Sequence, residues 1–167
     1  MRLVLPNIKY ARSWRVAGEE FEKAEIFGTW HHHGFSKKLP ELIKMLKDRS
    51  QGKNLHKGKV PSTEFWLIDK NKYIGSIDIR HKLSPALKIR GGHIGYAIRP
   101  SAWGKGYGNH LLRLGLKKAR TLNLKKVLIT CDDHNIPSLK IIEKNGGKLK
   151  EKAKVEGILI RRYWISL

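Results

Sequence analysis

The sequence has little cysteine and no long apolar run. Cys131 is its only cysteine, and a single thiol cannot form an internal disulfide or a cysteine-based zinc cluster. Near the N-terminus, Pro6 and Lys9 interrupt the apolar residues before a signal region can develop. We therefore expect a cytoplasmic protein with no export signal and no membrane-spanning helix.

Acidic residues are also scarce. The chain has 14 Asp and Glu against 35 Lys and Arg, a formal net charge of +21. The stretch from Ile79 to Cys131 contains twelve basic residues and no acidic residue. Such a positive field attracts phosphates, either of a nucleic acid or of a phosphorylated cofactor. The alternative is a solvated basic surface, because net charge says nothing about fold.

Length and composition predict one globular unit. A chain of 167 residues fits a single domain covering 1–167 rather than two domains. With 40% hydrophobic residues it has enough apolar material for a core and too much for a disordered chain.

Hydrophobic periodicity divides the chain into helices and strands. Apolar residues at three- and four-residue steps predict helices, and β-prone runs bounded by turn residues predict strands. The element order is β-α-α-β-β-β-α-β-α-β-β, an α/β arrangement. The predicted helices cover residues 9–27, 40–46, 107–122 and 136–144, and the predicted strands cover 3–5, 65–68, 73–79, 93–98, 127–131, 149–155 and 158–165.

The triplet His31–His33 lies between two predicted helices and is interpreted as a loop. Adjacent histidines point in different directions, so a single ion would need ligands from elsewhere. No metal site is expected.

A glycine-rich turn stands where the strand at 93–98 passes into the helix at 107–122. Residues 103–108 have the sequence Trp-Gly-Lys-Gly-Tyr-Gly. Such a turn leaves several backbone N–H groups unpaired at the positive end of the helix dipole, which favours phosphate binding. Glycine allows close approach of an anion, and Lys105 adds a charge. The spacing fits neither a Walker loop nor a dinucleotide fingerprint, and a helix start that needs glycine for packing is the alternative.

Together with its flanks, this turn resembles the acetyl-coenzyme A (acetyl-CoA) site of the GNAT N-acetyltransferase superfamily. The family pattern is a strand, a [Gln/Arg]-x-x-Gly-x-[Gly/Ala] turn, a helix, a strand and an Asn-x-x-[Ala/Ser] helix ending in Gly. The chain from about residue 64 onward resembles a bacterial branch of uncharacterised predicted acetyltransferases, with segments such as 91–96, 127–132 and 162–165. The matching residues are Gly106, Gly108, Asn135, Ser138 and Gly146.

The resemblance implies a mixed, mostly antiparallel central sheet of about seven strands with helices on both faces. It also implies that acetyl-CoA binds where the strands at 94–98 and 127–131 splay apart. The residues it assigns to cofactor binding are Tyr96, Ile98, Trp103, Gly104, Lys105, Gly106, Tyr107, Gly108, Asn135 and Ser138.

Two positions depart from the family pattern. Trp103 stands where the family has Gln or Arg, so backbone N–H groups must carry more of the diphosphate binding. Ile142 stands where many members have the tyrosine that protonates the departing thiolate. The identity of the general acid is therefore open.

Two residues are candidates for the general base that acyl transfer to an amine requires. His93 occupies the place of a family glutamate, and its ordinary pKa near 6.5 suits base work at neutral pH. The alternative is a strand histidine that bonds to neighbouring backbone. Glu64, like Asp78, is a second candidate base whose alternative is a solvated strand face. Cys131, inside an apolar strand, is expected to be an inert thiol rather than a nucleophile.

These features predict an acetyl-CoA-dependent N-acetyltransferase that acts on a primary amine, small molecule or peptide, by direct attack on the thioester. Two rivals use the same fold: a basic protein that binds RNA or the ribosome, and a non-catalytic acyl-CoA sensor. The acceptor and the oligomeric state, monomer or homodimer, cannot be derived from the sequence.

Overall fold

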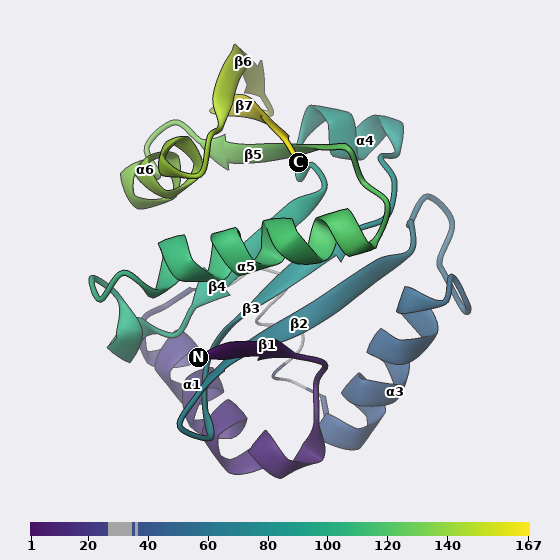
Figure 1. The fold of residues 1–167 in the computed structure, drawn as a ribbon, viewed down its shortest axis with the longest axis vertical. Helices are drawn as coiled ribbons and strands as arrows, with labels where there is room; N and C mark the ends of the chain where they lie inside the picture. Colours follow the sequence, from purple (N-terminus) through teal and green to yellow (C-terminus); the bar gives the residue numbers. More distant parts are fainter. Residues whose placement is uncertain (27–34, 36) are drawn as a thin grey trace.

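The computed structural model describes residues 1–26, 35 and 37–167. The histidine triplet at 31–33 therefore lies outside the described residues. The described chain contains seven strands in two sheets, with helices on both faces of the larger sheet (Figure 1). The expected α/β fold with about seven mostly antiparallel strands is thus confirmed, and the strands are divided between two sheets rather than joined in one.

The larger sheet has the strand order β1-β2-β3-β4, and every neighbouring pair is antiparallel. Glu64 on β2 lies opposite Asp78 on β3, which in turn lies opposite Gly95 on β4. Lys70 and Asn71, in the turn between β2 and β3, adopt positive φ angles of 43° and 64°. The four strands are β1 (Arg2–Val4), β2 (Ser62–Asp69), β3 (Lys72–Arg80) and β4 (Ile94–Ile98).

The smaller sheet has the order β5-β7-β6, again antiparallel throughout. Its edge strand β6 is exposed along most of its length and carries alternating lysines, a composition that protects a sheet edge from pairing with another chain. The three strands are β5 (Lys126–Asp132), β6 (Lys148–Val155) and β7 (Ile158–Ser166).

The helices follow the predicted pattern with three differences. The first ends at Lys23 rather than at residue 27, and the helix predicted at 40–46 runs from Leu39 to Ser50. The short helix at Pro85–Ile89 was not predicted; Ser84 caps it by accepting a hydrogen bond from the Leu87 N–H group. The described helices are α1 (Ala11–Lys23), α3 (Leu39–Ser50), α4 (Pro85–Ile89), α5 (Tyr107–Thr121) and α6 (Ile136–Lys144). No described helix has the length and apolar character needed to cross a bilayer.

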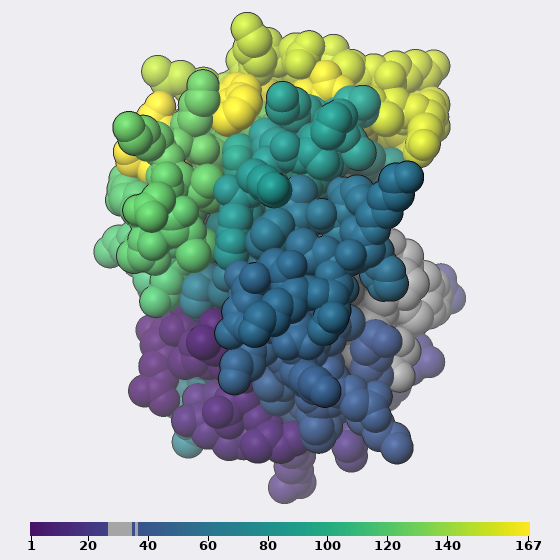
Figure 2. Space-filling model, turned by 90° about the vertical axis from the view of Figure 1, so that its right-hand side faces the viewer, coloured from purple at the N-terminus to yellow at the C-terminus, as the bar shows by residue number. Residues whose placement is uncertain are grey.

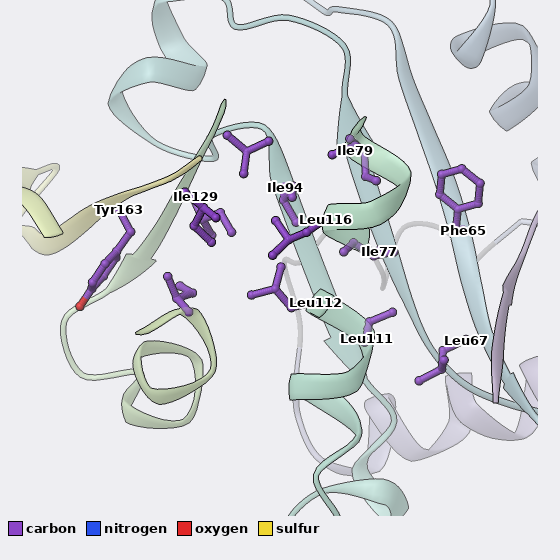
Figure 3. Packing of buried hydrophobic residues seen from close by; sticks show 14 of the residues in the cluster. Phe65, Leu67, Ile77, Ile79, Ile94, Leu111, Leu112, Leu116, Ile129 and Tyr163 are labelled. Atoms are coloured by element: carbon purple, nitrogen blue, oxygen red, sulfur yellow. The ribbon is translucent and has the colours of Figure 1, made fainter. Parts of the chain in front are cut away.

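Strand alternation sorts the core into two clusters. Phe65 and Leu67 of β2 face α5, whereas Trp66 and Ile68 of the same strand face α1 and α3. Helix α5 lies between the two sheets, with Leu112 and its neighbours buried against strands of both (Figure 3). This helix therefore fixes the position of one sheet relative to the other.

The two sheets meet at a single backbone junction. The N–H group of His93 donates to the Leu128 carbonyl over 2.7 Å. Gly92 fits there only because it has no side chain, since an added Cβ would lie 2.3 Å from that carbonyl oxygen. Beyond this point β4 pairs with β3 alone, so its other edge faces an opening toward β5.

Candidate functional site

The glycine turn, residues 103–108, has the geometry of an anion-binding helix start. Gly104 and Gly106 adopt φ angles of +72° and +77°, a region that other residues rarely occupy. Gly106 is the N-cap of α5 and provides no side-chain acceptor. Among the residues that the structure describes, nothing accepts a hydrogen bond from the backbone N–H groups of residues 104–109. These donors are therefore available to a ligand.

Side chains around the turn bond to its own backbone. The Trp103 indole N–H donates to the Ile98 carbonyl over 2.7 Å, while the ring as a whole stays 52% exposed. The Lys105 ammonium donates to the Ser101 carbonyl over 2.7 Å. Both residues are therefore held beside the turn before any ligand binds.

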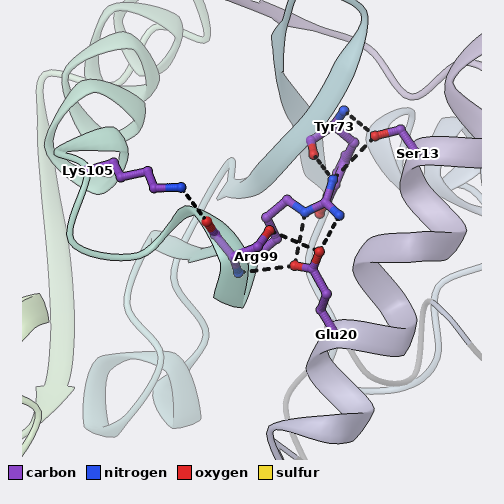
Figure 4. A network of polar contacts seen from close by, with 6 residues as sticks. Ser13, Glu20, Tyr73, Arg99 and Lys105 are labelled. Carbon is purple, nitrogen blue, oxygen red and sulfur yellow. Dashed lines mark hydrogen bonds and ion pairs between the residues drawn. The ribbon is translucent and has the colours of Figure 1, made fainter.

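A buried ion pair fastens the segment before the turn to α1. The Arg99 guanidinium pairs with Glu20 through two nitrogens and also donates to the Tyr73 carbonyl over 3.1 Å (Figure 4). Glu20 in addition accepts from the Ser101 N–H group over 3.1 Å. The hydrogen bonds from Arg99 hold the pKa of the Glu20 carboxyl at about 2. Sequence reasoning missed this network, because nothing local links residues 79 positions apart.

The opening between β4 and β5 brings most of the predicted cofactor residues together. An added Cβ on Gly108 would lie 2.6 Å from Ile141 of α6 and 3.9 Å from Ile98 of β4, so the two helices and the strand converge here. The Tyr96 hydroxyl reaches the Ser138 carbonyl over 3.5 Å. Residues 95–98 remain half-buried, as expected for a strand that lines an opening.

Asn135 closes the start of α6 on the far side of this opening. Its side-chain oxygen accepts from the Ser138 N–H group over 3.1 Å, a standard N-cap bond. The helix then ends at Lys144, followed by Asn145 and by Gly146 at φ +85°.

His93 is bound into the sheet junction. Its Nδ1 atom accepts a hydrogen bond from the Leu128 N–H group over 2.9 Å, so the proton of the neutral ring lies on Nε2. Burial and the nearby Arg80 charge lower the pKa of His93 to about 4. The lone pair that a general base needs is thus already engaged, and these contacts fit the alternative of a strand histidine that bonds to neighbouring backbone.

Glu64 belongs to a buried charged cluster on the face of the sheet that α3 covers. Arg49 of α3 donates to Asp78 over 2.8 Å and lies 3.6 Å from Glu64. The Trp66 indole N–H donates to the other Glu64 oxygen over 3.0 Å. Burial, and secondly the Asp78 charge, raise the pKa of Glu64 to about 7. Glu64 is therefore a buried carboxyl that titrates near neutrality.

The position of the family tyrosine is part of the core. Ile142 is fully buried, and its side chain occupies the space in which a Cβ on Gly147 would fall. One helical turn earlier, on the same face of α6, Ser138 meets the Tyr96 hydroxyl. Burial raises the pKa of Tyr96 above its ordinary value, so the phenol keeps its proton.

The remaining ionisable candidates have structural roles. Burial raises the pKa of the half-buried Cys131 thiol to about 12, which matches the expected inert thiol. Asp132 pairs with Arg90 over 3.2 Å, and Asp133 pairs with Arg161 over 2.6 Å. In the described part of the chain, no group of three His, Cys, Asp or Glu residues could hold a metal ion.

A cavity of about 740 Å³ opens beside α1. Its wall includes Trp14, Gly18, Phe35 and Leu39, with charged residues at the rim. Phe35 was predicted to lie near the acceptor, whereas its predicted neighbour Trp30 is outside the described residues. None of the predicted catalytic or cofactor residues lines this cavity.

Comparison with known proteins agrees with the class that this geometry defines, an acyltransferase with an opened sheet and a glycine turn. The family model described as "Acetyltransferase (GNAT) domain" matches residues 12–148. The chain therefore belongs to the GNAT acetyltransferase family, as the motif resemblance predicted. The comparison with curated proteins found no match.

Solved structures share the fold at low sequence identity. The microcin C7 self-immunity acetyltransferase MccE, solved with acetyl-CoA and AMP, matches with a TM-score of 0.70 at 17% identity, over 99% of this chain and 91% of that one. RimL, a ribosomal L7/L12 alpha-N-protein acetyltransferase solved with coenzyme A, has a TM-score of 0.70 at 15% identity, over 99% and 93%. The spermidine N-acetyltransferase SpeG of Vibrio cholerae has a TM-score of 0.64 at 17% identity, over 99% and 95%.

Proposed function

We propose that this protein transfers the acetyl group of acetyl-CoA to a primary amine by direct attack of the amine on the thioester. The observation that carries the proposal is the set of free N–H donors at residues 104–109, at the positive end of α5. Six converging donors suit the diphosphate of the coenzyme, which is the most highly charged part of its arm. The titles of the similar structures, which pair this fold with coenzyme A, support the same ligand.

The coenzyme arm would run from the glycine turn into the opening between the sheets. The free edge of β4 presents backbone N–H and C=O groups there, which suit the amides of the pantetheine arm. Tyr96, Ile98, Asn135 and Ser138 would line its path. Gly108 supports this placement, because its lack of a side chain allows α5 and α6 to approach each other.

The transfer requires an unprotonated amine and a proton for the leaving sulfur. The amine nitrogen forms a bond to the acetyl carbon, the carbon–sulfur bond breaks, and the nitrogen loses a proton. Glu64 would accept that proton, directly or through water, because its pKa near 7 suits base work at neutral pH. The thiolate would take a proton from the Tyr96 hydroxyl, which lies in the opening one helical turn from the position of the family tyrosine.

A pair of glycine variants tests the cofactor site. Gly106 and Gly157 both have positive φ, +77° and +83°, and at neither position would a Cβ meet another atom within 4 Å. Gly106→Val and Gly157→Val therefore impose the same kind of backbone strain, the first in the glycine turn and the second in the β6–β7 turn. Calorimetric titration should show at least tenfold weaker acetyl-CoA binding for Gly106→Val and unchanged binding for Gly157→Val.

Substrate fragments and an amine panel complete the test. Acetyl-pantetheine, which lacks the diphosphate, should bind the unaltered protein far more weakly than acetyl-CoA and should not distinguish the two variants. Thiol release should then be screened over polyamines and peptides with free N-termini, the acceptor types named for SpeG and RimL. Absence of acetyl-CoA binding would overturn the proposal, and binding without thiol release from any amine would favour the acyl-CoA sensor.

A further inference from the structure

One face of α5 is uniformly positive and takes no part in the site described above. Arg113, Lys117 and Arg120 stand at i, i+4 and i+7, so they form one stripe along the helix. All three are exposed. Lys125 and Lys126 extend the stripe into the turn before β5, which lies on the surface beside the end of α5 (Figure 2, green). We call these five residues the α5 basic face.

The charges of this face are not neutralised within the described structure. None of the five residues forms an ion pair with a described carboxylate. Arg113 contacts His110 over 3.0 Å, and the Lys126 ammonium lies 5.0 Å from the centre of the Trp164 ring. Helix α5 itself contains no acidic residue. Like charges at these spacings repel each other, and a bound polyanion would relieve that repulsion.

The composition of the face distinguishes between classes of polyanion. Surfaces that bind proteins contain apolar and aromatic side chains at their centre, but no large exposed hydrophobic residue lies between Trp103 and Ile136. Surfaces that bind single-stranded nucleic acids present aromatic rings for base stacking, and this face has none exposed. A row of cations without apolar neighbours suits the phosphate backbone of a duplex.

We propose that the α5 basic face binds the phosphate backbone of double-stranded nucleic acid, independently of base sequence. This binding is separate from the acetyl-CoA site, because the stripe runs along the side of α5 and the glycine turn stands at its start. The protein therefore holds a duplex and the coenzyme at the same time.

Fluorescence anisotropy with a labelled RNA duplex of about 20 base pairs, and with a DNA duplex of the same sequence, tests the proposal. About five phosphate contacts predict that log affinity falls with log salt with a slope of about −4 to −5, so affinity drops roughly 10²- to 10³-fold between 50 and 200 mM NaCl. The triple variant Arg113→Gln, Lys117→Gln, Arg120→Gln should reduce the slope by about three and weaken binding at least tenfold at 50 mM.

A charge-matched control separates a site from net charge. Lys44, Lys47 and Lys53 are exposed, on and just after α3, and no described carboxylate pairs with them. Their triple change to Gln lowers the net charge equally and should leave the salt slope nearly unchanged. Equal weakening by both triples would overturn the proposal, as would absence of duplex binding at 50 mM.

Two competitions exclude the other sources of binding. Saturating acetyl-CoA should not displace the duplex; displacement would mean that the duplex occupies the glycine turn. A polyglutamate peptide at equal negative charge should compete poorly, and equal competition would show that the face binds acidic protein instead. Both triple variants should keep the acetyl-CoA affinity of the unaltered protein, so this test remains distinct from the test of the proposed enzyme.

Discussion

His93 and Glu64 are buried ionisable side chains whose pKa values move in opposite directions from a common cause. Burial disfavours the charged form, so it lowers the pKa of the histidine and raises that of the carboxyl. The histidine is then neutral at every pH at which the protein would work. The carboxyl changes charge near pH 7, which is the property that a general base requires.

His93→Gln separates the structural role of the histidine from a catalytic one. A glutamine oxygen can replace Nδ1 as the acceptor for the Leu128 N–H group, but it does not titrate. The folded pKa of about 4 lies below the ordinary 6.5, so the unfolded state binds more protons between these values. The unaltered protein should therefore lose stability relative to His93→Gln as pH falls from 6.5 to 4, by up to about 3 kcal/mol.

Urea unfolding of both proteins at pH 7.5, 6, 5 and 4 measures this difference. Parallel curves would mean that the ring is not buried in its neutral form. Turnover gives the second readout: near-normal rates for His93→Gln are expected, and a loss of tenfold or more with unchanged acetyl-CoA affinity would restore the histidine as the base.

Glu64→Gln tests the carboxyl. The glutamine keeps an acceptor for the Trp66 indole but cannot take a proton. Because Glu64 acts in its deprotonated form, kcat/KM of the unaltered enzyme should rise with pH through about 7. Glu64→Gln should lower kcat/KM at least tenfold and remove that inflection, whereas Glu41→Gln, on the exposed first turn of α3, should change neither. An inflection that survives in Glu64→Gln would assign the base elsewhere.

At the scale of elements, the glycine turn depends on a helix far away in sequence. Arg99 and Ser101 immediately precede the turn, and both bond to Glu20 of α1. The hydrogen-bonded carboxylate has a folded pKa of about 2 against an ordinary 4.5. Its stabilising contribution is therefore complete above about pH 4.5 and is lost as pH falls toward 2.

Glu20→Gln should cost about 1–2 kcal/mol of unfolding free energy at pH 7, since partial exposure screens the pair. Acetyl-CoA affinity should fall with it, because the segment before the turn loses its attachment to α1. Denaturant unfolding and calorimetric titration measure the two effects. Glu19→Gln, an exposed neighbour on the same helix, should change neither, and a stability loss without any loss of affinity would show that the turn holds its shape unaided.

The elements that the sequence predicted best are those with local signals at both ends. Residues 136–144 form a helix as predicted, because Asn135 caps its start and Gly146 follows its end. Helix α4 was missed, since five residues give too short a periodic pattern. The glycine turn was predicted from its composition, but the ion pair that holds it and the bond between His93 and Leu128 join segments far apart in sequence. Only the folded chain brings such partners together.

At the scale of the whole molecule, one junction sets how far the two sheets diverge. β4 and β5 meet through His93 and Leu128, and α5 fills the space between the sheets beyond that point. The proposed coenzyme arm occupies the opening that results. A change at the junction should therefore affect both folding and the site, although the junction itself has no chemical role.

Gly92→Ala is the most direct disturbance of this junction. The added Cβ would lie 2.3 Å from the Leu128 carbonyl oxygen, at a φ of +63° that alanine disfavours. Overpacking and backbone strain together should cost about 2–4 kcal/mol, and the displaced β4 should bind acetyl-CoA more weakly. Gly58→Ala has a similar φ of +82° with nothing within 4 Å, so it carries the strain without the collision and should cost about 1 kcal/mol with normal binding. Urea unfolding and calorimetric titration of the two variants decide the matter, because equal losses in both would mean that the sheets separate independently of this contact.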